Sequence, residues 1–501
     1  MEQDKTLTIV EGKTAEECRR LSEQEYVKSE KLRLFLPQTC NLEGKITNKI
    51  KENQTSVVLV RRIQPRTGRK EQLPQPRNVF FFDDEKIDSR RYEVLAKAAL
   101  DINLYSFFSG SSEYVLATPE NLKLDRYMVS GAMVKCPDSR ALGETWRLDT
   151  ELRMIFPNKI EEKVVQFKDI ADFEDYLITK SYRWEDFRDF FWYYHEKNRP
   201  ELDGVYRFPQ LMEQLILAFT LSGKHKGYPL HLLLWGNPAV GKSQILKCLN
   251  HKFGETVAIS NGAGSTLKSL IPSFKGTIPQ PGNLATANRM CIMDEFLHIP
   301  TRTGITDLSR DDLWAGLNIL LEHSESEFRS GNCAGTYRMT ARCLFATNPT
   351  SIYGSISQLF RTNNAPFFSR MLVFPIFGET EKEMRLHITT KNAVLKREPR
   401  FDPDVFLSIV DYLQSFNSEF DEEKVNVIFS ETKDVLPDTF EGYTRYLHHA
   451  KCLMDGITKT RCLAEGDMSF VASHEDYKVL NTLWQEMVNG WVITWDKTGR
   501  N

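Results

Sequence analysis

The chain has 501 residues, of which 41% are hydrophobic and 27% are charged, and this length and composition predict a globular protein of two or three domains. The formal net charge of -3 excludes a strongly basic chain, so any contact with nucleic acid must use local basic patches. No apolar run reaches the roughly 18 residues of a membrane span. The acidic N-terminus lacks the apolar stretch of a secretory signal.

The cysteines indicate the redox state of the cell compartment. The nine cysteines include no CxxC pair. This usage is typical of a reducing compartment and argues against a zinc ribbon. We therefore expect an intracellular protein without a zinc ribbon, in the cytoplasm, or in the nucleus if the source is eukaryotic.

Residues 1–165 are expected to form a β-rich domain. Short runs such as SVVLVRRI, NVFFF, YMVSGAMV and TELRMIF alternate with Pro, Gly and Asp, which predicts a small barrel or sandwich. A basic turn lies between two of these strands and contains Arg61, Arg62, Arg66, Arg69 and Lys70. Such a cluster fits phosphate contacts, and it fits a solvated loop equally well.

The rest of the chain changes character twice. Residues 166–202 are acidic and aromatic and predict a helical linker. Its aromatic rings could stack bases, but the interleaved carboxylates would repel phosphate, so we expect the rings to serve helix packing between the two halves of the chain. Residues 203–380 alternate short apolar strands with helical segments, which predicts an α/β domain with a mostly parallel sheet. Residues 381–501 carry helical periodicity and predict an all-helical C-terminal domain.

A phosphate-binding loop lies inside the α/β region. The run HLLLW predicts a buried strand, GNPAVGKS follows it directly, and QILKCLNHKF predicts a helix. In this context backbone N–H groups and the helix N-terminus face phosphates. Lys242 would reach the β- and γ-phosphates, and Ser243 would bind Mg²⁺. The predicted ATP-binding residues are Gly236, Asn237, Pro238, Ala239, Val240, Gly241, Lys242, Ser243 and Gln244.

Three later positions fit the chemistry of ATP hydrolysis. The strand MCIMDE ends in Asp294, which suits Mg²⁺, and Glu295, which suits polarisation of the attacking water. The strand CLFAT leads to Asn348, whose amide fits contact with that water or the γ-phosphate, although an Asn-Pro turn is the simpler interpretation of that residue alone. Arg370 stands just before another strand and fits either an arginine finger for a neighbouring subunit or a surface arginine.

In this order the elements resemble an AAA+ ATPase module. LLLWGNPAVGKSQILK, MCIMDEF, TARCLFATNP and FFSRMLVFPIF resemble the corresponding signatures of the minichromosome maintenance (MCM) replicative helicases. DGVYRFPQLMEQ is similar to the family's entry segment, and residues 261–282 and 320–342 resemble its helix-2 insert and pre-sensor-1 hairpin. The resemblance covers about residues 203–490.

The resemblance implies a ring, usually of six subunits, with ATP and Mg²⁺ between neighbours and DNA in the central channel. Arg445 matches the family's sensor-2 arginine, and it would act with Arg370 on the neighbour's nucleotide. The channel-facing cations that the resemblance implies are Lys275, Arg329 and Arg338. At the pre-sensor tip this chain has Ser-Gly-Asn where the family carries a lysine, which puts tight gripping of DNA in doubt.

The expected fold is therefore an α/β AAA+ P-loop ATPase (203–380) with a β-rich, oligonucleotide-binding-like N-terminal domain, an aromatic helical linker and an all-helical lid. The expected function is an ATP-dependent DNA helicase or translocase. The net acidity and the neutral tip favour a different class, an AAA+ ATPase of the MoxR or chelatase kind that remodels a protein client. A subunit that binds ATP structurally and hydrolyses little of it is a third interpretation, which the intact set of Lys242, Glu295, Asn348 and Arg370 disfavours.

Overall fold

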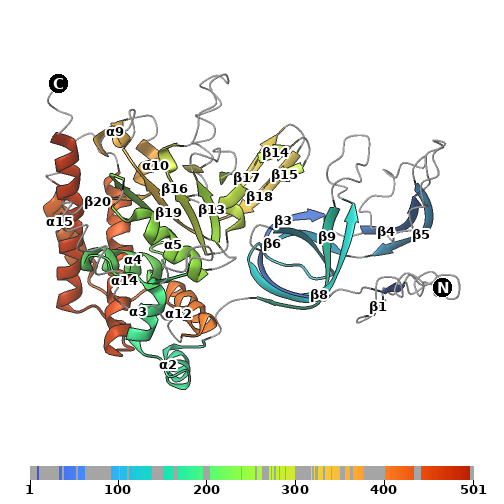
Figure 1. Cartoon of the computed structure of the whole chain (residues 1–501), viewed down its shortest axis with the longest axis horizontal. Coiled ribbons are helices and arrows are strands. Elements are labelled where there is room, and N and C mark those ends of the chain that lie inside the picture. Colours follow the sequence, from blue (N-terminus) through green and yellow to red (C-terminus); the bar gives the residue numbers. More distant parts are fainter. Residues whose placement is uncertain are drawn as a thin grey trace. The chain divides into compact units, whose positions relative to one another are not determined.

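The structure of the chain is a computed structural model (Figure 1) that divides into two compact units. Unit 1 contains Met1–Lys163, Pro272–Asn288 and Glu325–Arg338, and unit 2 contains Val164–Ile271, Arg289–Ser324 and Met339–Asn501. The residues that the structure describes are 8–10, 33–35, 39–51, 55–62, 92–100, 102–109, 112–137, 151–162, 167–195, 204–238, 240–253, 257–261, 270–271, 273–275, 278–280, 282–287, 289–298, 317–318, 321, 325–330, 333–339, 341–349, 356–361, 365–376, 401–433 and 442–496.

Unit 1 is built around a closed five-stranded barrel. Its strands are β3 (Thr39–Lys51), β6 (Asn103–Ser109), β7 (Ser112–Thr118), β8 (Arg126–Pro137) and β9 (Glu151–Glu162). They follow the order β3-β6-β7-β9-β8, and every pair is antiparallel except β7 with β9. Alternate side chains point inward along these strands, so one face of each strand fills the barrel. Its core cluster includes Ile46, Tyr105, Phe107, Leu116, Val129 and Ile155.

Shorter strand pairs complete unit 1. The hairpin of β4 (Thr55–Arg62) and β5 (Tyr92–Leu100) lies in the chain connection between β3 and β6. The other elements are β1 (Thr8–Val10), β2 (Arg33–Phe35), β14 (Ser273–Lys275), β15 (Ile278–Gln280), α7 (Gly282–Thr286), β17 (Glu325–Ser330) and β18 (Cys333–Arg338). The β14–β15 hairpin contacts the β17–β18 hairpin, and β18 contacts β3.

Unit 2 contains a parallel sheet. Its strands are β12 (Leu232–Gly236), β13 (Val257–Asn261), β16 (Met290–Asp294), β19 (Arg342–Thr347) and β20 (Leu372–Ile376), in the order β13-β16-β19-β12-β20. The side chains of β12, β19 and β20 are buried throughout, because helices cover the sheet (Figure 1). Every pair of neighbouring strands is parallel, so the carboxyl ends of all five strands lie at one edge of the sheet.

Helices form the rest of unit 2. They are α2 (Ile170–Thr179), α3 (Trp184–Trp192), α4 (Gln210–Leu221), α5 (Lys242–Phe253), α9 (Ile356–Arg361), α10 (Ala365–Ser369), α12 (Pro403–Ser415), α13 (Glu422–Lys433), α14 (Tyr443–Glu465) and α15 (His474–Asp496), with the 3-10 turn η6 (Phe296–His298) and the short strands β10 (Tyr193–Tyr194) and β11 (Gly204–Val205). Within the described ranges, none of the helices combines the length and the apolar composition that crossing a membrane requires.

The aromatic segment of the predicted linker packs inside unit 2. Phe187 and Phe190 on α3 lie against Phe406 of α12, with ring centroids 5.3 Å apart in both pairs. Phe187, Phe190, Phe191 and Trp192 are all buried, so these rings have no face available for stacking bases. These aromatic side chains therefore pack within unit 2.

A buried ion pair and buried hydrogen bonds attach helices of unit 2 to the sheet. The Arg289 guanidinium, just before β16, donates two hydrogen bonds to Asp411 of α12, at 3.0 and 2.9 Å. Arg342, at the start of β19, donates to Phe219 O at 2.9 Å at the end of α4. At its middle, α14 approaches α4 so closely that a Cβ on Gly456 would lie 2.0 Å from Ala218 O. The helices and the sheet thus form one packed body.

Candidate nucleotide site

The predicted phosphate-binding loop joins β12 to α5 at the carboxyl edge of the sheet. Gly236 ends the strand, and Lys242 is the first residue of the helix. Gly241 has a φ of +89°, a left-handed conformation that glycine adopts without a steric cost. Asn237, Pro238 and Ser243 are exposed, Val240, Gly241 and Gln244 are half-buried, and Ala239 lies outside the described residues.

Lys242 is the buried cation of this loop. Its side chain donates hydrogen bonds to Gly236 O and Asn237 O, both at 2.7 Å, and to Asn348 Oδ1 at 3.0 Å. Burial disfavours the charged ammonium and lowers the pKa of Lys242 to about 8, while the nearby Asp294 carboxylate acts in the opposite direction. A phosphate group next to Lys242 would stabilise the charged ammonium that burial disfavours.

The acidic pair stands at the end of β16. The Asp294 carboxylate accepts a hydrogen bond from the backbone N–H of Glu295 at 2.9 Å. Glu295 has a φ of +52°, a conformation that costs energy for a residue with a Cβ. Both side chains are half-buried and remain accessible at the carboxyl edge. Backbone strain of this kind is concentrated at functional sites, and the sequence gives no signal for it.

Strand β19 lies between β12 and β16 and brings Asn348 to the loop. Trp235 on β12 is level with Thr347 on β19, so Asn348 follows at the height of the loop. The Thr347 hydroxyl accepts from the backbone N–H of Leu297 at 3.2 Å and so fixes the segment that follows Glu295. The contribution of Thr347 could not be predicted from sequence, because it depends on which strands are neighbours.

Phe208 is a second residue that sequence reasoning missed. It is buried in the segment before α4, and its backbone N–H donates to Glu213 Oε1 at 3.0 Å. A Cβ on Gly241 would lie 3.7 Å from the Phe208 ring, so this ring forms one wall of the loop. The loop is therefore bounded by an apolar side chain from outside the α/β strands.

Arg370 and Arg445 lie at the opposite end of the sheet. Leu372, the first residue of β20, is level with Leu232, the first residue of β12, so Arg370 precedes the amino ends of the strands. Arg370 and Arg445 line one cavity of about 380 Å³, together with Tyr228, Pro229, His231, Leu321, Thr444, His448, His449 and Cys452. The five residues of β12 separate the amino edge from the loop. At about 3.3 Å per strand residue, the cavity therefore lies on the order of 15 Å from the loop.

The residues at the carboxyl edge fit a magnesium nucleotide. They supply a twelve-residue helix that begins at the loop, the buried ammonium of Lys242, the half-buried carboxylate of Asp294 and the exposed hydroxyl of Ser243. Backbone N–H groups and a lysine bind phosphate, whereas carboxylate and hydroxyl oxygens bind Mg²⁺. The two arginines at the amino edge cannot reach a phosphate at the loop of the same chain.

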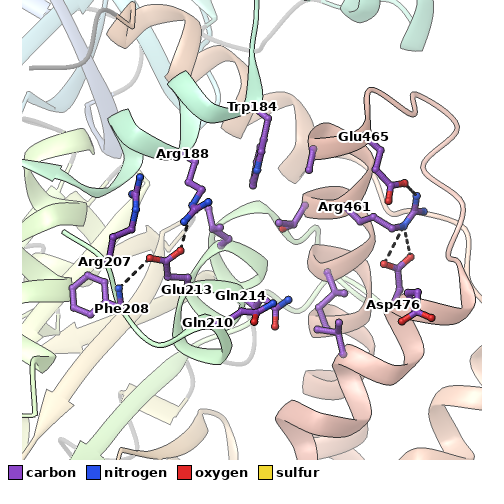
Figure 2. A pocket seen from close by; sticks show the side chains of 16 residues that line it. Trp184, Arg188, Arg207, Phe208, Gln210, Glu213, Gln214, Arg461, Glu465 and Asp476 are labelled. Atoms are coloured by element: carbon purple, nitrogen blue, oxygen red, sulfur yellow. Dashed lines mark hydrogen bonds and ion pairs between the residues drawn. The ribbon is translucent and has the colours of Figure 1, made fainter. Parts of the chain in front are cut away.

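A second cavity, larger than the one that Arg370 and Arg445 line, lies elsewhere in the described part of the chain. It has a volume of about 660 Å³ and lies between α3, α4, α14 and α15 (Figure 2). Arg188 bonds to Glu213 at 3.3 Å on one side, and Arg461 bonds to Asp476 at 2.9 Å on the other. Arg207 bonds to Asp189. Because each arginine of the wall already has a carboxylate partner, this cavity lacks the unpaired charge that would attract a phosphate.

The predicted nucleic-acid contacts fall in unit 1. Arg61 and Arg62 end β4, Lys275 ends β14, Arg329 lies on β17, and Arg338 ends β18. Arg66, Arg69 and Lys70 lie outside the described residues. The two hairpins that carry Lys275, Arg329 and Arg338 contact each other through β14 with β17 and β15 with β18. The structure thus groups these three positions in one part of unit 1.

Comparison with known proteins gives a distant relationship. No family model matches the chain. Over 232 residues it is 25% identical to proteins named "Probable DNA helicase MCM9" from Oryza sativa subsp. indica and from Oryza sativa subsp. japonica. The match covers 42% of this chain and 32% of each relative, so the chain spans about a third of the length of the curated relatives it matches. This similarity supports a distant relationship to MCM proteins.

Proposed function

We propose that the chain is an AAA+ ATPase related to the MCM proteins, which assembles into a ring and hydrolyses ATP between subunits to move along DNA. The proposal rests first on the hydrogen bond of 3.0 Å between Lys242 and Asn348. It joins the phosphate-binding loop to the neighbouring strand β19. On the other side of β19, β16 ends at Asp294, and Glu295 follows directly. A cation for phosphate, a carboxylate pair and a polar amide are the groups that phosphoryl transfer to water requires.

Each group has one task at this site. Lys242 and the backbone at the start of α5 would bind the β- and γ-phosphates. Glu295 would accept hydrogen bonds from the attacking water, and Asn348 would orient that water or the γ-phosphate. Ser243 and Asp294 would hold Mg²⁺, which neutralises the charge that develops on the phosphate oxygens. Phe208 limits access of bulk water to the loop from one side.

The two arginines support a site shared between subunits. Arg370 and Arg445 lie together at the amino edge of the sheet, far from the loop of their own subunit. A second copy of the chain that docks this edge against the loop would complete the charge around the γ-phosphate. Head-to-tail contacts of this kind close into rings when the rotation permits.

The barrel supports the nucleic-acid part of the proposal. Numbered along the chain, its strands have the order 1-2-3-5-4, and the last strand pairs with the first. A five-stranded Greek-key barrel is the architecture of oligonucleotide-binding folds, which bind with the connection between strands 1 and 2. The β4–β5 hairpin is that connection here, and the basic turn of residues 61–70 falls within it.

The testing experiment is the ATPase rate of the purified full chain, with and without single-stranded and duplex DNA at moderate salt. We expect DNA to stimulate hydrolysis, and we expect Lys242→Ala to lose hydrolysis under every condition. Lys247→Ala is the matched control, because Lys247 is an exposed lysine on the same helix. A rate that is indifferent to DNA would contradict movement along DNA and would favour the remodelling of a protein client.

A further inference from the structure

Strand β20 is the last strand of the described sheet, and helices cover its outer edge. The Tyr446 hydroxyl accepts from the backbone N–H of Val373 at 3.2 Å and donates to Met371 O at 3.0 Å. Trp491 Nε1 donates to Val373 O at 2.9 Å. In a parallel sheet, one residue of a neighbouring strand would make the same two bonds as Tyr446, so this hydroxyl takes the place of a missing strand residue.

The same turn of α14 also holds the residue before Arg370. The Arg445 guanidinium donates to Ser369 Oγ at 3.2 Å, and His449 Nε2 lies 3.2 Å from Ser369 O. Burial lowers the pKa of His449 to about 4, so the imidazole is neutral and its single N–H serves this carbonyl. Burial raises the pKa of Tyr446, so its hydroxyl keeps the proton that it donates.

The residues on both sides of Arg370 are therefore fixed points, which means here residues held in place by hydrogen bonds from α14. Ser369 before it is held by Arg445 and His449, and Met371 after it is held by Tyr446. The Arg370 backbone N–H donates to Phe367 O at 3.0 Å, and its guanidinium donates to Pro366 O at 2.6 Å. Arg370 and Arg445 thus belong to one rigid element, built from α10, β20 and α14.

We propose that Tyr446 and His449 are positioning residues, which hold Arg370 and Arg445 as one pair for the nucleotide of the neighbouring subunit. This inference rests on the function proposed above, and it adds the residues that set the geometry of the shared site. Arginine fingers contribute about 10³- to 10⁵-fold to kcat, and a displacement of about 1 Å at a reacting centre costs on the order of 100-fold. Loss of one fixed point should therefore lower kcat.

The first test is Tyr446→Phe, which removes the hydroxyl and keeps the ring. We expect kcat for ATP hydrolysis to fall about 10-fold, because Arg370 loses one of its fixed points. ATP affinity should stay unchanged, because the loop of the same subunit is intact. Tyr477→Phe is the matched control, since the Tyr477 hydroxyl also accepts from a backbone N–H, that of Asp421, and lies in the same helical region.

Mixing of subunits separates positioning from a general loss of structure. Tyr446→Phe protein mixed with excess Lys242→Ala protein should regain turnover per Tyr446→Phe subunit, because its intact loop then meets the intact arginines of its neighbour. A loss of kcat that mixing does not restore would overturn the inference and indicate a structural role. Wild-type kcat in Tyr446→Phe would overturn it as well.

Arg370→Ala in the same mixing experiment distinguishes this inference from the proposed function. Rescue of Arg370→Ala by Lys242→Ala, with no effect of Tyr446→Phe, would leave the shared site standing and remove only the positioning role. Failure to rescue Arg370→Ala would contradict the shared site itself.

His449 provides a second set of variants. His449→Gln keeps an N–H donor for Ser369 O, whereas His449→Leu removes it. We expect His449→Leu to lower kcat and to be rescued by mixing, and His449→Gln to retain most of the wild-type kcat. Equal kcat values for the two variants would contradict a positioning role for this hydrogen bond.

Discussion

The Lys242 ammonium and the Asn348 amide oxygen lie 3.0 Å apart, although 106 positions separate them in the chain. The bond exists because β19 lies next to β12 and both strands end at the same edge of the sheet. It brings the Asn348 side chain to the predicted phosphate-binding loop.

Asn348→Ala should lower kcat by about 100-fold, the cost of removing one oriented polar group from a reacting centre. ATP affinity should change little, because Lys242 keeps its bonds to two backbone carbonyls. Steady-state hydrolysis and equilibrium binding of a fluorescent ATP analogue separate the two effects. If kcat is unchanged, the Asn-Pro turn is the whole role of this residue.

Glu295 combines a proposed chemical role with a strained backbone. Glu295→Gln should bind ATP and hydrolyse it about 100-fold more slowly, because the amide is a poor base. Glu295→Gly should lose hydrolysis too, yet it should raise the free energy of unfolding by up to about 1 kcal/mol, since glycine accepts a φ of +52° without strain. Chemical denaturation of the two variants measures the difference. Equal stabilities would argue against stored strain.

ATP binding should be coupled to proton uptake by Lys242. Its pKa is about 8 because burial disfavours the ammonium, so at about pH 8.5 a large fraction of the side chain is neutral. A bound phosphate raises this pKa, so the complex takes up a proton at about pH 8.5 and takes up almost none through Lys242 at pH 7, where the lysine is already charged. Titration calorimetry with magnesium ATP in buffers of different ionisation enthalpy detects the uptake.

The control for that measurement is Lys242→Arg. Arginine stays charged at every working pH, so its complex with ATP should show no proton uptake at about pH 8.5. Uptake of the same size in Lys242→Arg would assign the proton to another group.

Local patterns predict the loop better than they predict its surroundings. The apolar run before Gly236 and the helical periodicity after Lys242 are local, and the structure has β12 and α5 at those places. The end of an apolar strand also suffices to nominate Asp294 and Asn348. Which strands are neighbours is a property of long-range packing, so the contact between Asn348 and Lys242 had to come from the structure.

The fixed points around Arg370 have no comparable sequence signal. In the sequence, Tyr446 and His449 indicate only two buried positions of a helix. No periodic pattern predicts that the Tyr446 hydroxyl takes the place of a strand residue. Phe208 and Thr347 act through neighbours that are distant along the chain. The nucleic-acid positions, the domain boundaries and the role of each ATP-site residue stay predictions.

The Arg289–Asp411 pair should be essential for stability. Both side chains are almost fully buried, with exposed fractions of 2% and 4%. Asp411→Ala leaves a buried guanidinium without its carboxylate, which should lower the free energy of unfolding by about 3–5 kcal/mol. The double variant Arg289→Met with Asp411→Leu should recover most of that loss, because it removes both charges. Urea denaturation measures both, and a double variant that is less stable than Asp411→Ala would contradict this account.

Charge reversal in the basic turn tests the nucleic-acid surface. Replacement of Arg66, Arg69 and Lys70 by glutamate should weaken binding to DNA and reduce its dependence on salt, because fewer phosphate contacts release fewer counterions. Fluorescence anisotropy with labelled single-stranded DNA at several salt concentrations measures both quantities.

The matched control for the basic turn has the same change in net charge at another place. Lys180, Lys424 and Lys478 are exposed lysines on the helical elements, and their replacement by glutamate alters long-range attraction without touching the turn. If the two triple variants lose affinity equally, net charge explains the effect and residues 61–70 form a solvated loop. A larger loss of DNA affinity and a flatter salt dependence in the turn variant would identify direct phosphate contacts. The number of counterions released on binding depends on the number of phosphate contacts, whereas long-range attraction requires no contact.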